Sequence, residues 1–351
     1  MHCNQWAWPP HKELSLEQIS NLIRIFRSWN VRTLTLAGGN PLLYPYLVQV
    51  LEMARSAGIG VAIVTEGLRM PPDILRRIGE LTSWIRFSLD GPTAEIHDDI
   101  RSSPGLFDAV VDCIQSLRPH ADLRIGLNCV VQRRNVKHLS GVIDLAERLQ
   151  VSGVFFKIAH GDDPHSRFLL SMADWAEFSA WLYHRRAIPA SVETNVDELR
   201  SFIERSVDVD DAVQGRPIRA FYERLLVHCY VPLFFLTCDS EANAYPCDYL
   251  QADTRAWGGR YAVIRNEFRL GNILESPNEV LARAADLVRR RVHELPSSGY
   301  DECGNCTRFC QLNAGLTKID TNLAAIYGSK DSLRDHIEAL LGSKQVGIPF
   351  L

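Results

Sequence analysis

The sequence has 351 residues and a formal net charge of −4, and 46% of its residues are hydrophobic, which is enough to build a sizeable core. The slightly acidic balance gives no electrostatic reason to expect a nucleic acid or an anionic membrane as a partner. No apolar run reaches the roughly 18 residues that a membrane span needs, and the first residues lack the apolar core of a secretory signal. We therefore expect the chain in a reducing cytoplasm.

Short apolar runs alternate with amphipathic stretches over the first half of the chain. The runs are rich in Val, Ile, Leu and Phe and fit parallel strands buried on both faces. The expected strands are Thr33–Leu36, Gly60–Thr65, Trp84–Leu89, Leu123–Val131 and Gly153–Ile158. The expected helices are Leu16–Trp29, Pro45–Ala57, Pro72–Leu81, Phe107–Leu117, Val136–Leu149 and Ala173–Arg186. Ser15, followed three positions later by Gln18, can cap the first helix. The alternation predicts repeated βα units with right-handed crossovers.

The pattern changes after about residue 190, where we place the boundary between a first domain, 1–190, and a second, 191–351. In the second domain, Tyr230–Leu236 and Ala244–Tyr249 predict the two strands of a hairpin. Pro277–Val292 predicts a helix that begins at its proline, and a further helix is expected near the C-terminus. The second domain is therefore expected to be a small α+β unit.

The chain contains nine cysteines, six of them between positions 229 and 310. Cys303 and Cys306 form a CxxC pair, and Cys310 follows closely. Clustered thiolates of this kind bind zinc or an iron–sulfur cluster, and spacing alone does not choose between the two. Free thiols or core residues are the alternative, which we prefer for Cys113 and Cys129 because they fall in an expected helix and an expected strand.

Segments at the ends of successive strands resemble the motifs of one enzyme family. Gly38–Pro41 resembles the GGEP motif, and Thr65–Gly67 resembles the "TNG" of the next strand. Phe87–Pro92, with the later Ile96–Asp98 and Arg101, resembles the "SLDG…HD..R" segment. Cys3 resembles the last cysteine of a CxxxCxxC motif, with His2 in its aromatic position. In this order the motifs are similar to those of the radical S-adenosylmethionine (SAM) superfamily, over residues 1 to about 190.

This resemblance implies a partial parallel (β/α)6-type barrel that lacks its first strand. In the family, three cysteines hold a [4Fe–4S] cluster, SAM binds the open iron, and its cleavage gives a 5′-deoxyadenosyl radical that abstracts hydrogen from the substrate. The resemblance implies Cys3 as a cluster ligand. It also implies that SAM is bound by His2, Gly38, Gly39, Asn40, Pro41, Glu66, Ser88 and Asp90.

The sequence departs from the family pattern in two places. The first two cysteines of CxxxCxxC would lie before Met1, so we expect a truncated or misassigned start, with a natural remnant as the alternative. The chain as it stands is then not expected to assemble a radical-generating cluster. Asn40 stands where Glu is usual, and Glu66 where Asn is usual. Our hypothesis is a swap in which Glu66 pairs with the SAM ammonium and Asn40 gives a neutral hydrogen bond. The alternatives are two unrelated drifts and a solvated Glu66.

The C-terminal half resembles the SPASM or twitch extension of the same family. Cys229 is followed by twelve residues, then Ala242, four residues and Cys247, whereas the family has glycine at the position of Ala242. Leu270–Ile273 resembles the "LGNI" of the extension. The resemblance favours the one-cluster twitch version, with one auxiliary [4Fe–4S] cluster. Its implied ligands are Cys229, Cys247, Cys303 and Cys306.

Two thiols are left over by this ligand set, Cys238 and Cys310. Each is a candidate hydrogen donor for an epimerisation, and the alternatives are a buried thiol or another cluster ligand. The resemblance implies an oxidation or epimerisation at a C–H bond of a sugar, a cyclitol or a peptide. It also implies an electron donor such as flavodoxin or ferredoxin. The alternative function is a non-catalytic remnant, or a protein that holds zinc or an iron–sulfur cluster for structural reasons.

Overall fold

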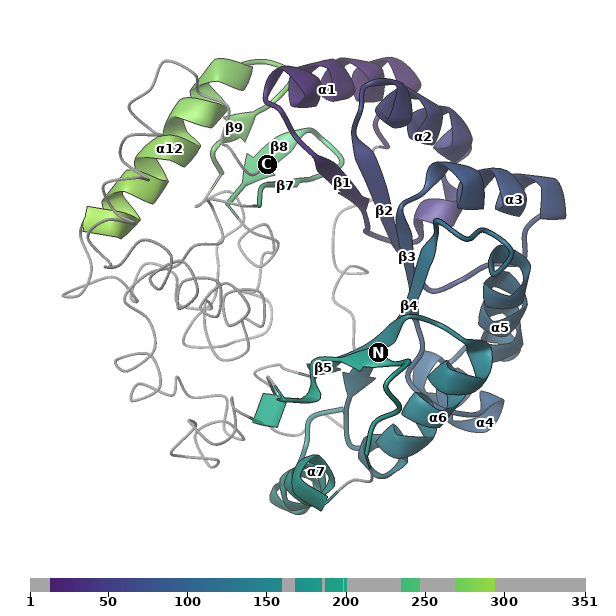
Figure 1. Ribbon diagram of the computed structural model, residues 1–351. Helices are drawn as coiled ribbons and strands as arrows, with labels where there is room; N and C mark the ends of the chain where they lie inside the picture. The colour runs from purple at the N-terminus through teal and green to yellow at the C-terminus, as the bar shows by residue number, and fades with distance from the viewer. Residues whose placement is uncertain are drawn as a thin grey trace. The chain divides into compact units, whose positions relative to one another are not determined.

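The computed structural model describes residues 13–159, 168–184, 187–197, 199–200, 235–246 and 269–293 (Figure 1). These residues fall into two compact units. The first contains everything described between 33 and 200, and the second contains the N-terminal helix together with the elements from 235 onwards. Within the described ranges, no helix is both long and apolar enough to cross a membrane.

The first unit is built on a sheet of six parallel strands in the order of the chain, β1-β2-β3-β4-β5-β6. The strands are β1 Thr33–Leu36, β2 Gly60–Thr65, β3 Trp84–Ser88, β4 Arg124–Val131, β5 Gly153–Ile158 and β6 Glu193–Thr194. Each strand pairs in parallel with the next, so every crossover connects neighbours. This is the expected partial α/β barrel.

Helices cover one side of this sheet. They are α2 Leu47–Ser56, α3 Pro72–Leu81, α4 Ala94–Arg101, α5 Leu106–Leu117, α6 Leu139–Leu149 and α7 Met172–His184, with short 3-10 turns η2 at Pro41–Leu43 and η3 at Val136–His138. Figure 1 shows the strands as an arc with α2, α3, α5 and α6 along its outer side. The arc therefore has a convex face under the helices and a concave face on the inside.

Alternation along the strands assigns side chains to these two faces. On β3, Ile85 and Phe87 are each only 1% exposed and pack under the helices, as does the fully buried Leu89. Arg86 and Ser88 alternate with them and are only partly buried, so they lie on the concave face. The core of the first unit is thus the layer between sheet and helices, and the concave face is free to carry polar groups.

Most expected elements are confirmed with shifts of one or two residues at their ends. The expected helix Val136–Leu149 is divided into the turn η3 and the helix α6. The strand β6 and the helix α4 were missed. β6 has only two residues, too few for any periodicity, and is held to β5 by the side chain of Asn195, which accepts from the Phe156 backbone NH and donates to the Phe156 carbonyl.

The second unit contains α1 Leu16–Ser28, a three-stranded antiparallel sheet and α12 Pro277–His293. Ser15 and Gln18 form the expected capping box of α1. The sheet consists of β7 Thr237–Cys238, β8 Asn243–Tyr245 and β9 Gly271–Asn272. The expected second strand Ala244–Tyr249 is confirmed over Ala244 and Tyr245. Of the expected first strand Tyr230–Leu236, only 235–236 are described and they are not a strand; β7 follows directly after them. A third strand, β9, comes from the LGNI segment.

Ala242 lies in the turn between β7 and β8 and has a φ of 65°, in the left-handed region that favours glycine. Asp239 shapes this turn, because its carboxylate accepts hydrogen bonds from the backbone NH groups of Glu241 and Asn243. The turn thus keeps a glycine-like conformation although the sequence has alanine there.

Candidate active site

The candidate site lies where β1, β2 and β3 end. Because the strands are parallel, the segments that follow them emerge at one edge of the sheet. The register of β2 and β3 pairs Ala62 with Trp84. When this register is extended by four residues, Glu66 is aligned with Ser88. Ser88 is paired in turn with Asn128 on β4. The strand-end segments singled out from the sequence are therefore brought together at this edge, as predicted.

Asn40 connects the ends of β1 and β2 through its side chain. Its Nδ2 donates to the carbonyl of Gly67 over 3.2 Å, and its Oδ1 accepts from Thr65 Oγ1 over 2.7 Å. The same Oδ1 also accepts from the backbone NH of Leu42, which caps the turn η2. Both polar ends of Asn40 are thus engaged within the protein. Its direct hydrogen bond to a ligand remains a prediction, while its role in positioning the Thr65–Gly67 loop is structural.

Gly38 and Gly39 lie beside open space. A Cβ placed on either would have no described atom within 4 Å, and only Gly38 has a left-handed φ, at 131°. The backbone of Gly39 thus needs glycine neither for its conformation nor for its packing among the described residues. A position of this kind suits close approach of a ligand to the backbone.

Gly67 differs, because a Cβ there would lie 2.8 Å from Val110 Cγ2 and its φ is 83°. Packing of the loop against α5 therefore requires glycine at this position.

Glu66 and Asp90 share a cation at the same edge. Arg101 on α4 lies with its Nε 2.7 Å from Asp90 Oδ2, and its guanidinium is 4.0 Å from Glu66 Oε2. Asp90 is completely buried, whereas the Glu66 side chain is 45% exposed. The closer pair is Asp90–Arg101, so the carboxylate of Glu66 is left accessible for a positively charged ligand group.

Asp90 also organises the loop after β3. Its Oδ1 accepts from the Val130 backbone NH over 2.8 Å, its own backbone NH donates to His97 Nδ1, and its carbonyl accepts from Asn135 Nδ2. These contacts tie β3, β4 and α4 together. Direct cofactor binding by Asp90 remains a prediction, and the structure gives it a positioning role.

Asn128 is a site residue that the sequence reading missed. It lies beside Ser88 on the concave face of β4, is 8% exposed, and its Oδ1 has no hydrogen-bond partner among the described residues. Gln132, just after β4, is fully buried, and within the same described part of the chain both polar atoms of its side-chain amide lack partners. Buried amides normally find partners, so these two side chains indicate a place where a ligand completes the hydrogen bonding. No motif in the sequence distinguishes them.

Residues 1–145 match the Radical SAM superfamily. This part of the chain is a radical SAM domain. The segments at the strand ends that resemble the family motifs all lie within the matched residues.

Relatives of this chain include a heme synthase and a mycofactocin maturase. It is 25% identical over 301 residues to the AdoMet-dependent heme synthase of Methanosarcina barkeri, covering 85% of this chain and 80% of the relative. It is 32% identical over 138 residues to the mycofactocin maturase MftC of Mycobacterium tuberculosis, covering 39% of this chain and 35% of the relative. The chain thus matches only about a third of the maturase.

Solved structures share the fold. The chain aligns with anSMEcpe with bound AdoMet at a TM-score of 0.56 and 15% identity, covering 86% of this chain and 83% of the other. It aligns with Streptococcus suis SuiB bound to S-adenosylmethionine at a TM-score of 0.56 and 12% identity, covering 86% and 68%. These likenesses support the partial barrel.

All five expected cluster ligands, Cys3, Cys229, Cys247, Cys303 and Cys306, lie outside the described residues. The same holds for His2, expected at the SAM site, and for the candidate hydrogen donor Cys310. Convergence of the five ligands on clusters therefore remains a prediction.

The described cysteines are all free thiols. Cys113 on α5 and Cys129 on β4 are 2% and 0% exposed, which confirms them as core residues. Burial raises the pKa of the Cys238 thiol to about 12, and the neighbouring Asp239 adds to the shift. Its Sγ donates to the Asp239 carbonyl over 3.4 Å, so Cys238 is a protonated thiol at neutral pH, the form that a hydrogen donor requires.

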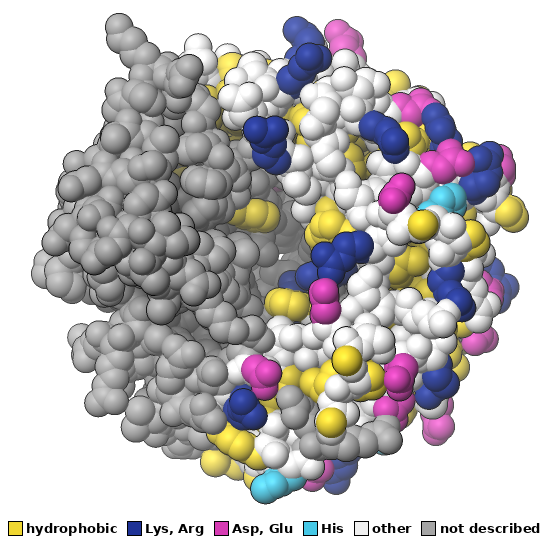
Figure 2. Space-filling view, viewed as in Figure 1, with side chains coloured by type: hydrophobic (Ala, Val, Ile, Leu, Met, Phe, Trp, Pro, Cys, Tyr) yellow, Lys and Arg dark blue, Asp and Glu magenta, His cyan; other side chains and the backbone are white. Residues whose placement is uncertain are grey.

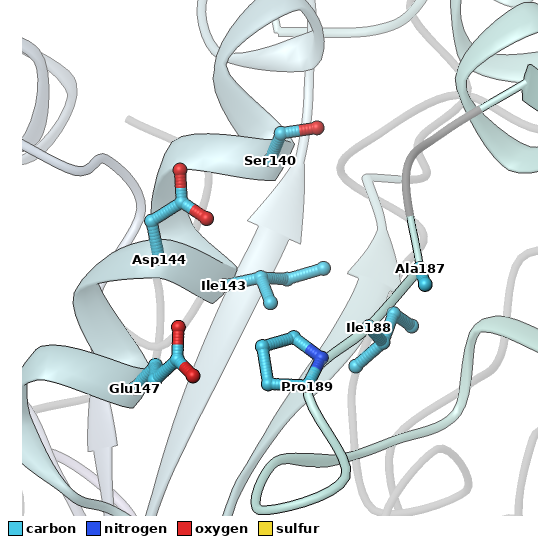
Figure 3. Close-up of a pocket in the computed structure, with 7 residues that line it drawn as sticks. All are labelled: Ser140, Ile143, Asp144, Glu147, Ala187, Ile188 and Pro189. Carbon is cyan, nitrogen blue, oxygen red and sulfur yellow. The ribbon is translucent and has the colours of Figure 1, made fainter.

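A separate cavity of about 160 Å³ lies between α6 and the segment 187–189 (Figure 3). Its wall combines the apolar side chains of Ile143, Ile188 and Pro189 with the carboxylates of Asp144 and Glu147. None of these residues belongs to the strand-end segments, so this cavity is not part of the candidate site.

Proposed function

We propose that this chain is a radical SAM enzyme that removes a hydrogen atom from a C–H bond of a substrate held on the concave face of the barrel. The observation that carries the proposal is the edge formed by Gly39, Glu66 and Ser88, where an open backbone and an accessible carboxylate lie together at the ends of parallel strands. When bound, SAM and its [4Fe–4S] cluster would supply the 5′-deoxyadenosyl radical; the protein's own residues hold and orient the reactants.

Each residue has a defined task in this proposal. The Gly38–Gly39 backbone lets the methionine part of SAM approach closely. Glu66 pairs with its ammonium, which needs a compensating charge once water is excluded. Asn40 and Asp90 keep the loops in position through the contacts described above. The exchange of Asn and Glu relative to the family pattern thus moves the carboxylate from the end of β1 to the end of β2.

The proposed auxiliary cluster rests on the second unit. Its β7–β8 turn has the glycine-like Ala242, and Tyr245, which lies two residues before the expected ligand Cys247, is completely buried. These observations support a twitch-type extension with Cys229, Cys247, Cys303 and Cys306 as ligands and with flavodoxin or ferredoxin as electron donor. For the substrate, the names of the relatives favour a tetrapyrrole or a peptide over the sugars and cyclitols also considered.

SAM binding tests the proposal in the full-length protein, which includes the two upstream cluster cysteines expected from the family pattern and is reconstituted under anaerobic conditions. A hydrogen bond to a charged group contributes roughly 1.5–3 kcal/mol, so Glu66→Gln should weaken SAM binding about ten- to a hundredfold in equilibrium dialysis. Glu95→Gln, an exposed carboxylate on α4, is the matched control and should bind SAM like the parent. Equal affinity of Glu66→Gln and the parent would refute the swap.

Two further readouts separate the proposal from a structural role. Iron and sulfide analysis with an absorption spectrum distinguishes an iron–sulfur protein from a zinc protein. Formation of 5′-deoxyadenosine after reduction distinguishes an enzyme from a non-catalytic remnant. A full-length, reconstituted protein that neither binds SAM nor forms 5′-deoxyadenosine would overturn the proposed function.

A further inference from the structure

Arg86 is a charged side chain on the concave face that the motifs do not explain. It lies in the middle of β3, between the buried Ile85 and Phe87, and points to the opposite side of the sheet from them. Its strand neighbours are Val64 on β2 and Gly126 on β4. Arg86 therefore lies two residues before Ser88 on the same concave face of β3. The candidate SAM site lies beyond Ser88, at the end of the strand.

Two aromatic rings hold the guanidinium of Arg86. Its central carbon lies 4.9 Å from the ring centroid of Trp84 and 4.9 Å from that of Phe155. Trp84 precedes it on the same strand, and Phe155 lies on β5 at the level of Asn128. Burial lowers the pKa of Arg86, and the nearby charge of Arg124 adds to this effect, against a smaller opposing contribution from Glu193.

No carboxylate among the described residues forms an ion pair with Arg86. The nearest candidate, Glu193, is paired with Arg124 over 2.7 Å, and both of those side chains are mostly exposed. A partly desolvated cation without an anion is unfavourable, and contacts with aromatic faces compensate for it only in part. Arginines of this kind are typical of sites that recognise carboxylates or phosphates through the planar guanidinium.

Two glycines lie beside Arg86 on the neighbouring strands β4 and β5. Gly126 and Gly153 are paired with each other and place no side chain on the concave face. A Cβ on Gly126 would touch Arg86 Cγ at 3.5 Å, and a Cβ on Gly153 would collide with the Glu193 carbonyl at 2.4 Å, so the stem of Arg86 and the backbone of β6 fill this level. Further along the strands lie Asn128, whose Oδ1 has no hydrogen-bond partner among the described residues, and the exposed Lys157.

Figure 2 shows Lys and Arg side chains beside hydrophobic ones, and also Asp or Glu, on the inner side of the arc of strands. At Arg86 the concave face combines a positive charge with the aromatic rings of Trp84 and Phe155. This combination suits a substrate that has both a carboxylate and a flat or apolar body.

We infer that Arg86 binds a carboxylate of the substrate, with Trp84 and Phe155 packing beside it. The inference rests on the proposed function and specifies its substrate class. Carboxylates of this kind occur as the propionates of a tetrapyrrole and as the C-terminus or an acidic side chain of a peptide. Arg86 is distinct from the groups assigned to SAM, which lie one level higher at the strand ends.

Paired probes that differ only in the carboxylate test this assignment. One pair is Fe-coproporphyrin III and its tetramethyl ester; the other is acetyl-Ala-Phe-Tyr with a free C-terminus and its C-terminal amide. Dissociation constants are measured anaerobically with the reconstituted full chain and SAM present, by quenching of tryptophan fluorescence. In at least one pair the acid should bind ten times or more tighter than its neutral partner, and that pair identifies the source of the carboxylate.

Variants then assign the preference to Arg86. Arg86→Gln should abolish the difference between acid and neutral probe, and Arg86→Lys should retain part of it. Arg76→Gln, which removes an exposed arginine from the outer helix α3, should leave the difference unchanged. SAM affinity should be the same in all four proteins, and the unfolding midpoints check that each variant is folded.

The inference is overturned if the parent binds SAM but shows no preference for either acid, or if Arg86→Gln keeps the preference. Loss of SAM affinity in Arg86→Gln would also overturn it, since Arg86 would then serve the cofactor. Failure of the parent to bind SAM is a different result, because it contradicts the proposed function itself.

Discussion

Removal of the charge of Asp90 should destabilise the barrel strongly. Asp90 is completely buried and its carboxylate lies 2.7 Å from Arg101, whose side chain is only 14% exposed. Breaking a buried ion pair by removing one partner typically costs about 3–5 kcal/mol, because the other charge is left buried without compensation. Asp90→Asn keeps an oxygen that can still accept from the Val130 NH, and Glu66 is 4.0 Å from Arg101. We therefore expect a loss near the lower limit, about 3 kcal/mol.

Urea unfolding of the parent and four variants, Asp90→Asn, Arg101→Met, their double variant and a control, measures this effect. The control Asp112→Asn removes a mostly exposed carboxylate on α5 and should change the free energy of unfolding by less than about 0.5 kcal/mol. The double variant Asp90→Asn/Arg101→Met should be less destabilised than the sum of its single variants, since it removes both charges. The reasoning is refuted if Asp90→Asn stays within about 1 kcal/mol of the parent, or if the cycle is additive.

Two other predictions follow from local geometry. Gly67→Ala should lower the free energy of unfolding by about 2 kcal/mol, because it combines a left-handed φ with a 2.8 Å contact to Val110; Gly105→Ala, with a φ of 81° and open space around it, should cost only about 1 kcal/mol. Equal losses would contradict the packing argument. Since burial raises the pKa of Cys238 to about 12, its thiol should be alkylated by iodoacetamide at pH 8 far more slowly in the native than in the urea-unfolded chain, as mapped by mass spectrometry. Because the pKa of Cys238 is higher in the folded than in the unfolded chain, its contribution to the free energy of unfolding is present below the unfolded pKa of about 8.5 and is lost as the pH rises towards 12. Equal labelling rates in the native and the unfolded chain would contradict the raised pKa.

The sequence predicted the barrel because its signals are local. Buried parallel strands give continuous apolar runs, and glycine-containing motifs mark where they end. β6 could not be found in this way, since a two-residue strand has no pattern and depends on the side chain of Asn195. α4 was missed because its residues were assigned to a motif rather than to an element.

The sequence predicted which segments meet at the site, but not which of their side chains are available to a ligand. Motif order placed Asn40, Glu66 and Asp90 at one edge, yet only the structure shows that Asn40 and Asp90 use their polar atoms within the protein. Asn128 and Arg86 were missed for another reason. Their significance comes from strand register and from missing partners, which are properties of contacts between distant segments.

The order of the six strands has a consequence for how this protein is made. Each strand pairs with the one that precedes it in the chain, so every pairing needs only the residues already synthesised. Contacts between sequence neighbours lower the entropy cost of loop closure and favour fast folding. The barrel domain can therefore assemble in steps on the ribosome, β1 with β2, then β3, without waiting for the C-terminal part. The hydrogen bonds of Asp90 form late in this order of assembly, because its partner Val130 belongs to β4. The strand-end loops therefore take their final form only when the fourth strand has been added.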